Sequence, residues 1–238
     1  MILLALIVLG FAIALSYYAF EYYTFRRDGR EAEQTAQMMQ EIFEGDTTST
    51  RAFQVAVEET GNTDIVAYIS IAGTNVRNVV VQGADNDFYL HRDIFGAHNA
   101  NGSLFLDYRN AADFTDPNTI IYGHNMNNGT MFHNLRYYVN SGAETFFEAH
   151  SYITIMVENE VLVYEIFSAF ITRVDFNYIQ TEFADDQFAQ LIAELNRRNT
   201  LRTDRYARED DRVLLLSTCT NISRDTRIVV AGRLVSES

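Results

Sequence analysis

The sequence predicts a mostly β domain, built as a barrel or a sandwich, behind an apolar N-terminal helix. The first part rests on eight β-like runs between Ile65 and Val235, which are rich in branched and aromatic residues and are separated by turn residues. The second part rests on residues 2–20, an uncharged and mostly apolar stretch close to the about 20 residues that a helix needs to cross a bilayer. The β-like runs cover residues 65–71, 76–81, 103–107, 119–122, 152–157, 161–173, 213–218 and 227–235.

Length and composition narrow the classes of function. A chain of 238 residues, 47% of them hydrophobic, can build one sizeable core behind its N-terminal segment. Its formal net charge of −14 argues against nucleic acid as a partner, because phosphate-binding surfaces are basic. All 18 basic residues are arginine, so no lysine serves as a nucleophile or forms a Schiff base. The single cysteine excludes an intrachain disulfide and leaves the redox compartment open.

The N-terminal segment, residues 1–25, is predicted to be a membrane anchor. A cleaved signal peptide is the alternative, because residues 12–14 (Ala-Ile-Ala) faintly resemble a cleavage site. The apolar stretch is longer than a signal-peptide core, however, and it runs into aromatic residues suited to the membrane interface, which favours an anchor. These aromatic residues are Tyr17, Tyr18, Tyr22 and Tyr23.

The charges around this segment give an awkward orientation. Arg26, Arg27 and Arg30 follow it, and no charged side chain precedes it. The positive-inside rule alone would place the rest of the chain in the cytoplasm. Either a basic segment precedes Met1 or the rule does not hold here.

A helical stalk and a linker are expected between the anchor and the body. Residues 30–44 show apolar positions at helical spacing, and residues 45–50 are a polar linker. We therefore divide the chain into the anchor, a stalk and linker at residues 26–51, and a globular domain at residues 52–238.

Two further helices interrupt the predicted strands. The first is short and covers residues 143–150. The second covers residues 184–198 and combines apolar residues at helical spacing with two acidic residues near its start. The residues that carry this pattern are Phe188, Leu191, Ile192, Leu195, Asp185 and Asp186.

Three reactive side chains stand at the ends of predicted strands. Cys219 follows the apolar run 213–218, His124 follows the run 119–122, and Arg227 opens the last run. A free cysteine is often only a small buried hydrophobe, but the Ser-Thr-Cys-Thr context indicates a strand end at the surface. A thiolate nucleophile, an imidazole that moves protons and a cation that steadies an oxyanion are the parts of a cysteine acyl-transfer site.

Other arginines and histidines are weaker candidates for these roles. Arg224 lies in the loop before the last strand, and Arg233 lies further along that strand. No cluster of Cys, His and Glu has ligand spacing, so we predict neither a metal nor a cofactor. The remaining histidines lack the strand-end context and are interpreted as solvated or helix-surface residues: His91, His98, His133 and His150.

Five ordered blocks of sequence carry a family resemblance. They are residues 68–74 (YISIAGT), 80–90 (VVQGADNDFYL), 102–110 (GSLFLDYRN), 118–126 (NTIIYGHNM) and 216–220 (LSTCT). Together they resemble the sortases, specifically class B, from about Ile65 to Val235. The predicted helix ahead of the cysteine strand is similar to the helical insertion that separates class B from class A. Tyr68 stands where the family often has Trp and Ala72 where it often has Pro, and the gap between Cys219 and Arg227 is short.

The resemblance implies a fold and an activity. The fold is an eight-stranded sortase β-barrel with an N-terminal helix and a helical insertion before the catalytic Cys strand. It is anchored by a single-pass helix, with the catalytic domain outside the membrane of a Gram-positive-type cell, which reverses the orientation that the charges suggest. The implied activity is that of a cysteine transpeptidase. It cleaves the C-terminal sorting motif of surface proteins through a thioacyl-enzyme and transfers them to an amine of a peptidoglycan precursor or a pilin.

The resemblance also implies roles for individual residues. Cys219 is the nucleophile, His124 the general acid and base, and Arg227 the donor to the oxyanion. Asp107 and Arg109 are expected to make a structural polar contact, and Tyr122 to pack beneath the site. The substrate groove is expected to involve Ser217 and Thr218 and, on an approximate alignment of blocks, Asn86, Leu90, Tyr178 and Ile179; a core position is equally open for Leu90 and Ile179.

Two other functions remain open at this point. A membrane-tethered cysteine peptidase would use the same three residues and release its product to water. A surface binding module with the same barrel would not use them, and their joint presence argues against it.

Overall fold

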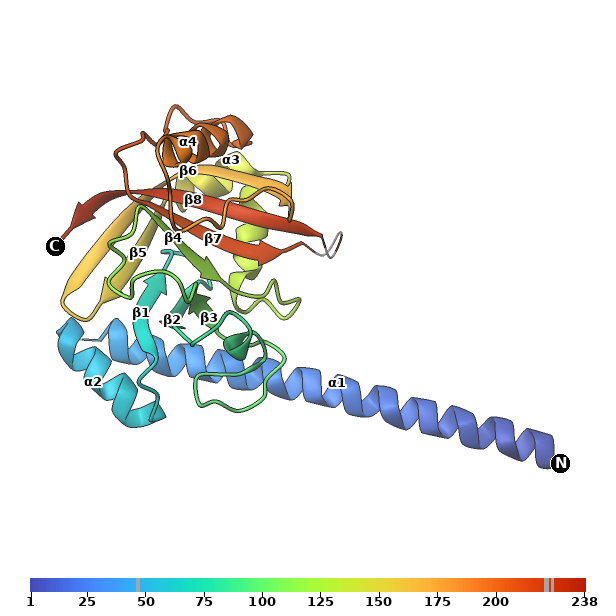
Figure 1. The fold of residues 1–238 in the computed structure, drawn as a ribbon. Coiled ribbons are helices and arrows are strands. Elements are labelled where there is room, and N and C mark those ends of the chain that lie inside the picture. Colours follow the sequence, from blue (N-terminus) through green and yellow to red (C-terminus); the bar gives the residue numbers. More distant parts are fainter. Residues whose placement is uncertain (46–47, 221–222, 224) are drawn as a thin grey trace.

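The computed structural model describes residues 1–45, 48–220, 223 and 225–238. Eight strands form its centre: β1 (Ile65–Ser70), β2 (Arg77–Val81), β3 (Leu104–Leu106), β4 (Asn118–Tyr122), β5 (Tyr152–Val157), β6 (Glu160–Arg173), β7 (Val213–Cys219) and β8 (Thr226–Glu237). They close into a barrel in the order β1-β2-β3-β4-β7-β8-β6-β5 (Figure 1). Neighbouring strands are antiparallel except in the pairs β2–β3 and β4–β7, which are parallel. The predicted eight-stranded barrel is confirmed, and the predicted strand ends differ from the observed ones by no more than two residues.

The apolar run of β7 is buried on both of its faces. Leu214 and Leu216 point into the barrel, where they pack in the cluster that contains Val230 of β8. Leu215, on the opposite face, packs in a second cluster beneath the helix that covers the barrel. A strand covered on both faces carries a continuous apolar run rather than an alternating one. The run therefore ends where the strand leaves the core, at Cys219, which is only partly buried.

The covering helix is α4 (Gln187–Arg198), which lies in the connection between β6 and β7 (Figure 1). Its apolar face is buried against the outside of the barrel, and Ser168 of β6 donates a hydrogen bond to the carbonyl of Leu195 at 2.7 Å. The predicted helical insertion is thus present. It begins at Gln187 rather than at residue 184, because Asp185 has a φ of 44° and takes a left-handed turn that cannot continue a helix.

One continuous helix, α1 (Ile2–Phe43), includes both the predicted anchor and the predicted stalk helix. Its N-terminal part projects away from the barrel, and its C-terminal part lies along the barrel near β1 and β2 (Figure 1). Contact begins near Asp28, whose carboxylate accepts a hydrogen bond from the backbone N–H of Ala100 at 3.1 Å. At the other end, the ring of Phe43 stacks on Tyr68 with the ring centroids 4.8 Å apart.

A second helix, α2 (Ser49–Thr60), has no counterpart in the sequence predictions. Thr48 caps its start, and Gly61 ends it in the left-handed conformation with a φ of 65°. Only Ala52, Phe53 and Ala56 are buried, so its apolar stripe is short. Because α2 begins at Ser49, the polar linker is shorter than the predicted 45–50; residues 46 and 47 lie outside the described part of the chain.

Three short helical segments complete the fold. They are the 3₁₀ helices η1 (Phe88–His91) and η2 (Phe132–Tyr138) and the helix α3 (Ala143–Ala149), which corresponds to the short helix predicted at 143–150.

Candidate active site

The ends of β4, β7 and β8 meet at one rim of the barrel. In the parallel pair β4–β7, Tyr122 lies opposite Ser217, and in the antiparallel pair β7–β8, Cys219 lies opposite Arg227. A groove of about 430 Å³ opens at this rim. All of the predicted catalytic and substrate-binding residues line it, together with residues that were not predicted. The lining is Asn86, Leu90, Phe105, Tyr122, Gly123, His124, Val174, Phe176, Asn177, Tyr178, Ile179, Ser217, Thr218, Cys219 and Arg227.

Cys219 is the last residue of β7, and the chain beyond β4 fixes its backbone. Gly123 donates its N–H to the carbonyl of Ser217 at 3.2 Å, which extends the β4–β7 pairing past the end of β4. Two residues further along β7, the carbonyl of Cys219 accepts a hydrogen bond from the side chain of Asn125, also at 3.2 Å. The residue that follows His124 therefore holds the peptide group of Cys219. Sequence analysis did not select Asn125, although it stands inside the Tyr-Gly-His block.

Gly123 is required by close packing. A methyl group at this position would overlap the side chains of Leu104 and Phe132, which belong to the barrel core. The glycine lets the backbone pass close to these two side chains on its way from β4 to His124, which lines the groove.

The hydrogen bond of His124 determines its tautomer. Its Nε2 lies 2.8 Å from the carbonyl oxygen of Leu90, and because a carbonyl only accepts, Nε2 carries the proton. Nδ1 is then the nitrogen that can exchange a proton. Burial lowers the pKa of His124 below its usual 6.5; the Leu90 carbonyl opposes this shift, and the nearby His91, whose ring centroid is 5.8 Å away, adds to it. His124 is therefore neutral at pH 7.

Arg227 stands at the start of β8, directly across from the cysteine. Its guanidinium donates to the carbonyl of Thr226 at 3.1 Å, and Thr220 donates its N–H to the same carbonyl at 3.1 Å. The side chains of Thr220 and Thr226 are also hydrogen-bonded to each other. These contacts hold Thr220, the first residue beyond β7, against Thr226, the first residue of β8, and Arg227 beside them lines the groove.

The competing arginines are placed differently. Arg233 lies opposite Val213, at the other end of β7, and pairs with Glu165 at 2.7 Å. It does not line the groove. Arg224 lies outside the described residues. Within the described part of the chain, no group of three His, Cys, Asp or Glu side chains is arranged to hold a metal ion.

The groove combines an apolar surface with a few polar groups. Tyr178 and Ser217 share a hydrogen bond of 2.7 Å, and both are buried. The hydroxyl of Thr218, next to the cysteine, is buried and has no hydrogen-bond partner among the described residues. The apolar wall of Val174 and Phe176 was not predicted, because it belongs to an irregular connection after β6 that shows no periodic pattern.

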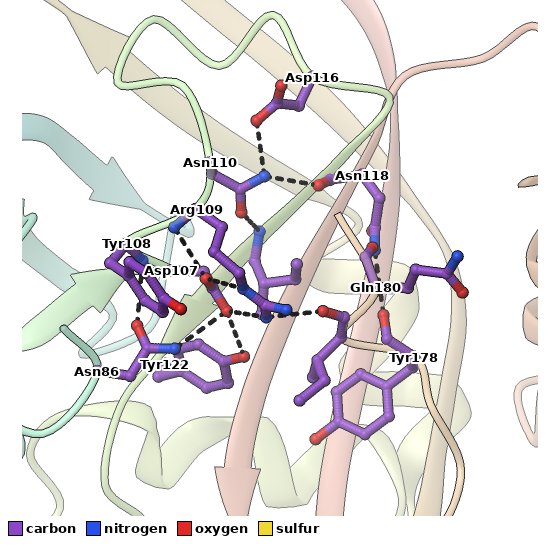
Figure 2. A network of polar contacts seen from close by, with 12 residues as sticks. Asn86, Asp107, Tyr108, Arg109, Asn110, Asp116, Asn118, Tyr122, Tyr178 and Gln180 are labelled. Atoms are coloured by element: carbon purple, nitrogen blue, oxygen red, sulfur yellow. Dashed lines mark hydrogen bonds and ion pairs between the residues drawn. The ribbon is translucent and has the colours of Figure 1, made fainter. Parts of the chain in front are cut away.

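A polar network lies behind the groove (Figure 2). Asp107, which is fully buried, accepts hydrogen bonds from Arg109, Tyr122 and Asn86. Burial alone would raise the pKa of Asp107, but the hydrogen bonds from Arg109 and Tyr122 outweigh it and hold that pKa below its usual value. The expected structural contact of Asp107 with Arg109 is therefore present, and Tyr122 joins it.

Comparisons with known proteins agree with this geometry. The Sortase domain family model matches residues 69–235. The chain is 36% identical to a Sortase B of Listeria monocytogenes over 180 residues, covering 74% of this chain and 72% of that protein. It is 35% identical to a Sortase B of Staphylococcus aureus over the same shares. The crystal structure of Staphylococcus aureus Sortase B superimposes with a TM-score of 0.77 at 31% identity, covering 87% of this chain and 98% of that one.

A sortase B from B. anthracis also superimposes with a TM-score of 0.77, at 29% identity over 88% of this chain and 99% of that one. Fold, sequence and family model thus agree over most of the chain. From these matches and the barrel with its helical insertion, we conclude that the chain belongs to the sortase family, as a class B member, and that it is a cysteine transpeptidase.

Proposed function

We propose that the protein is a membrane-anchored sortase that cleaves a C-terminal sorting motif in surface proteins and joins the new carboxyl end to an amine of a peptidoglycan precursor or a pilin. The observation that carries this proposal is the meeting of Cys219, His124 and Arg227 at one groove. The groove is open to solvent along one side and apolar along its walls, which suits an extended peptide.

In the first half of the reaction, Cys219 forms a thioester. The thiol passes its proton to Nδ1 of His124, and the thiolate attacks the carbonyl carbon of the scissile peptide bond. The carbonyl oxygen becomes an oxyanion, which Arg227 stabilises by donating N–H groups. Arg227 is not a base, because guanidinium keeps its proton. The C–N bond then breaks, and the imidazolium of His124 protonates the leaving amine.

In the second half, an amine resolves the thioester. Neutral His124 accepts a proton from the attacking amine, the C–N bond of the product forms, and the C–S bond breaks. The thiolate leaves and recovers the proton, so the enzyme returns to its starting state. Water in place of the amine would give hydrolysis.

The sequence-based division of the chain is part of the proposal. Residues 1–25 are the membrane anchor, residues 26–51 are the stalk and linker, and residues 52–238 are the catalytic domain, outside the cell. α1 is long and apolar enough to cross a membrane by length and composition. The N-terminal half of α1 is exposed along its whole apolar length, as expected for a helix whose surroundings are lipid.

A ligation assay tests the proposed function. The full chain in detergent micelles is incubated with sorting peptides of the Asn-Pro-x-Thr and x-Pro-x-Thr-Gly types, with and without triglycine as amine, and products are identified by mass spectrometry. A ligated product that depends on Cys219 supports the transpeptidase and identifies its motif. Products captured only by water in the presence of triglycine would favour the peptidase, and the absence of any product from a folded chain would contradict the proposal.

A further inference from the structure

We infer that Asp107 and Arg109 are positioning residues for the sorting peptide: their ion pair ties together the two facing walls of the groove and so sets its width. This inference rests on the proposed function of the groove. Neither residue lines the groove itself, so neither is expected to touch the reacting atoms.

The first step of the argument is the geometry of the pair. Two nitrogens of the Arg109 guanidinium donate hydrogen bonds to the carboxylate of Asp107. Nε lies 2.8 Å from Oδ1, and a terminal nitrogen lies 2.7 Å from Oδ2. The backbone N–H of Arg109 donates to the same carboxylate at 3.1 Å. A bidentate pair fixes direction as well as distance, so the position of Arg109 follows from that of Asp107. Asp107 directly follows β3 and is therefore fixed to the barrel.

The second step is the wall that Asp107 holds. Its Oδ2 accepts from the carboxamide of Asn86 at 3.1 Å and from the hydroxyl of Tyr122 at 2.9 Å. The other end of the same carboxamide accepts from the backbone N–H of Tyr108 at 3.1 Å. Asn86 belongs to the irregular connection between β2 and η1, which has no strand pairing of its own there. Its place in the groove therefore depends on the carboxylate behind it (Figure 2).

The third step is the facing wall. The guanidinium of Arg109 donates to the carbonyl of Ile179 at 2.9 Å. Ile179 belongs to the irregular connection between β6 and α4, which is outside the barrel ladder. The neighbouring Asn118 of β4 supports the same stretch by donating to the carbonyls of Tyr178 at 3.0 Å and Gln180 at 2.8 Å. One ion pair therefore joins both loops that line the groove. Without the contact of Arg109 to Ile179, the second loop keeps its hydrogen bonds to Asn118, but the pair no longer sets the distance between the two loops.

A second ion pair provides a matched comparison. Arg233 and Glu165 also approach to 2.7 Å, and the two arginine side chains are similarly exposed, 36% for Arg109 and 32% for Arg233. Arg233 and Glu165 join β8 to β6 and do not line the groove. If both pairs only contribute to stability, neither substitution should change the KM for the sorting peptide.

The experiment compares Arg109→Lys with Arg233→Lys in the full chain. Lysine keeps the charge but not the planar fork, so it can contact Asp107 without reaching the carbonyl of Ile179. Arg109→Lys should raise the KM for the sorting peptide by about tenfold, because displaced walls lose about one hydrogen bond's worth of binding that the ground state and the transition state share. The KM for the amine and the kcat should change much less, and Arg233→Lys should leave the KM for the peptide at the wild-type value. Asp107→Asn serves as the second variant if Arg109→Lys does not fold.

NMR spectroscopy tests the inference independently of enzymatic activity. The methyl resonances of Ile179 and the side-chain amide resonances of Asn86 should both shift or broaden in Arg109→Lys and stay in place in Arg233→Lys. Unchanged resonances, or a KM for the peptide equal to that of Arg233→Lys, would overturn the positioning role. If the resonances change but the wild type ligates no peptide, the proposed function fails while the structural link between the two walls stands.

Discussion

The two ends of the β7–β8 pair carry arginines on the same strand, yet their surroundings differ. At one end Arg227 faces Cys219 across the ladder and lies at the rim of the groove. At the other end Arg233 faces Val213, and its guanidinium pairs with Glu165 at 2.7 Å. Arg205 also pairs with Glu165, at 3.2 Å, so that carboxylate is shared by two cations.

The different surroundings of Arg227 and Arg233 show why the candidate active site forms at one end of the β7–β8 pair and not at the other. The β-ladder places both arginines with equal regularity, so pairing alone does not distinguish them. At the Arg233 end, a carboxylate from the neighbouring strand orients the cation. At the Arg227 end, the chain leaves the β4–β7 pairing after Gly123, and the loop that follows brings His124 and Asn125 to the end of β7. The site forms where one strand departs and its neighbours continue.

The largest expected effect comes from the cysteine at the groove end. Cys219→Ala removes the nucleophile, and in a covalent mechanism such a loss costs up to about 10⁶-fold in rate. Cleavage and ligation should both fall to background in the peptide assay. Because Cys219 is only partly buried at a strand end, the free energy of unfolding should change by less than about 1 kcal/mol, measured by urea denaturation. Residual cleavage by a folded variant would remove Cys219 from the nucleophile role.

The next effect separates the two arginines directly. Arg227→Gln should lower kcat/KM by about 10²- to 10³-fold, because it removes the proposed donor to the oxyanion. Arg227→Lys should recover only part of the rate, since lysine lacks the planar arrangement of donors. The control is Arg233→Gln, which should lower the free energy of unfolding while leaving kcat/KM unchanged. Equal rate losses in the two Gln variants would mean that Arg227 acts only through the fold.

A smaller effect is expected from the residue that holds the cysteine backbone. Asn125→Ala removes the hydrogen bond to the carbonyl of Cys219, and a bond worth about 1 to 1.5 kcal/mol corresponds to roughly a tenfold loss in rate. The loss should appear in kcat rather than in the KM for the peptide. Asn128→Ala, in the same loop but away from the groove, is the control, because its side chain contacts Asn101 instead. A loss of kcat in the control as large as in Asn125→Ala would assign the effect to the loop as a whole.

The comparison also shows what could be read from the sequence. The strands were predictable because apolar runs bounded by turn residues record which face is buried, and β7, buried on both faces, has the plainest run. Cys219, His124 and Arg227 could be selected because each stands where such a run begins or ends. The barrel order then brings those ends together, since β4 and β8 both neighbour β7.

Other features have no periodic signal in the sequence. The short apolar stripe of α2, limited to Ala52, Phe53 and Ala56, is too weak to mark a helix. The link from Asn125 to Cys219 joins residues far apart in the chain, and so does the link from Arg109 to Ile179. Both depend on loop conformations, which are set by tertiary contacts rather than by local pattern. Loop residues that line the groove, such as Phe176, were missed for the same reason.

The smallest expected effect is a pH dependence of the free energy of unfolding, caused by the protonation of His124 at the groove end. Burial lowers the pKa of His124 below 6.5, while the unfolded chain keeps the usual value of about 6.5. Between these two values the unfolded state binds more protons, so the free energy of unfolding rises with pH there. The contribution is fully present above pH 6.5 and is lost as pH falls toward the folded-state pKa. His124→Gln removes this titration, so its unfolding free energy, measured by urea denaturation from pH 5 to 8, should approach or exceed that of the wild type only at the acidic end.

Two parallel pH curves would show that His124 titrates alike in the folded and unfolded chains, and the lowering of its pKa by burial would then be wrong. The opposite end of β7–β8 offers no such dependence, because Arg233 and Arg205 keep their charge throughout this range. The groove end is therefore the end whose charge can change during a reaction. In the proposed mechanism a neutral imidazole takes up the proton that the thiol loses, so the reactive ion pair forms during the reaction. In the same proposal that pair forms at the strand end opposite Arg227, the residue proposed to stabilise the oxyanion that follows.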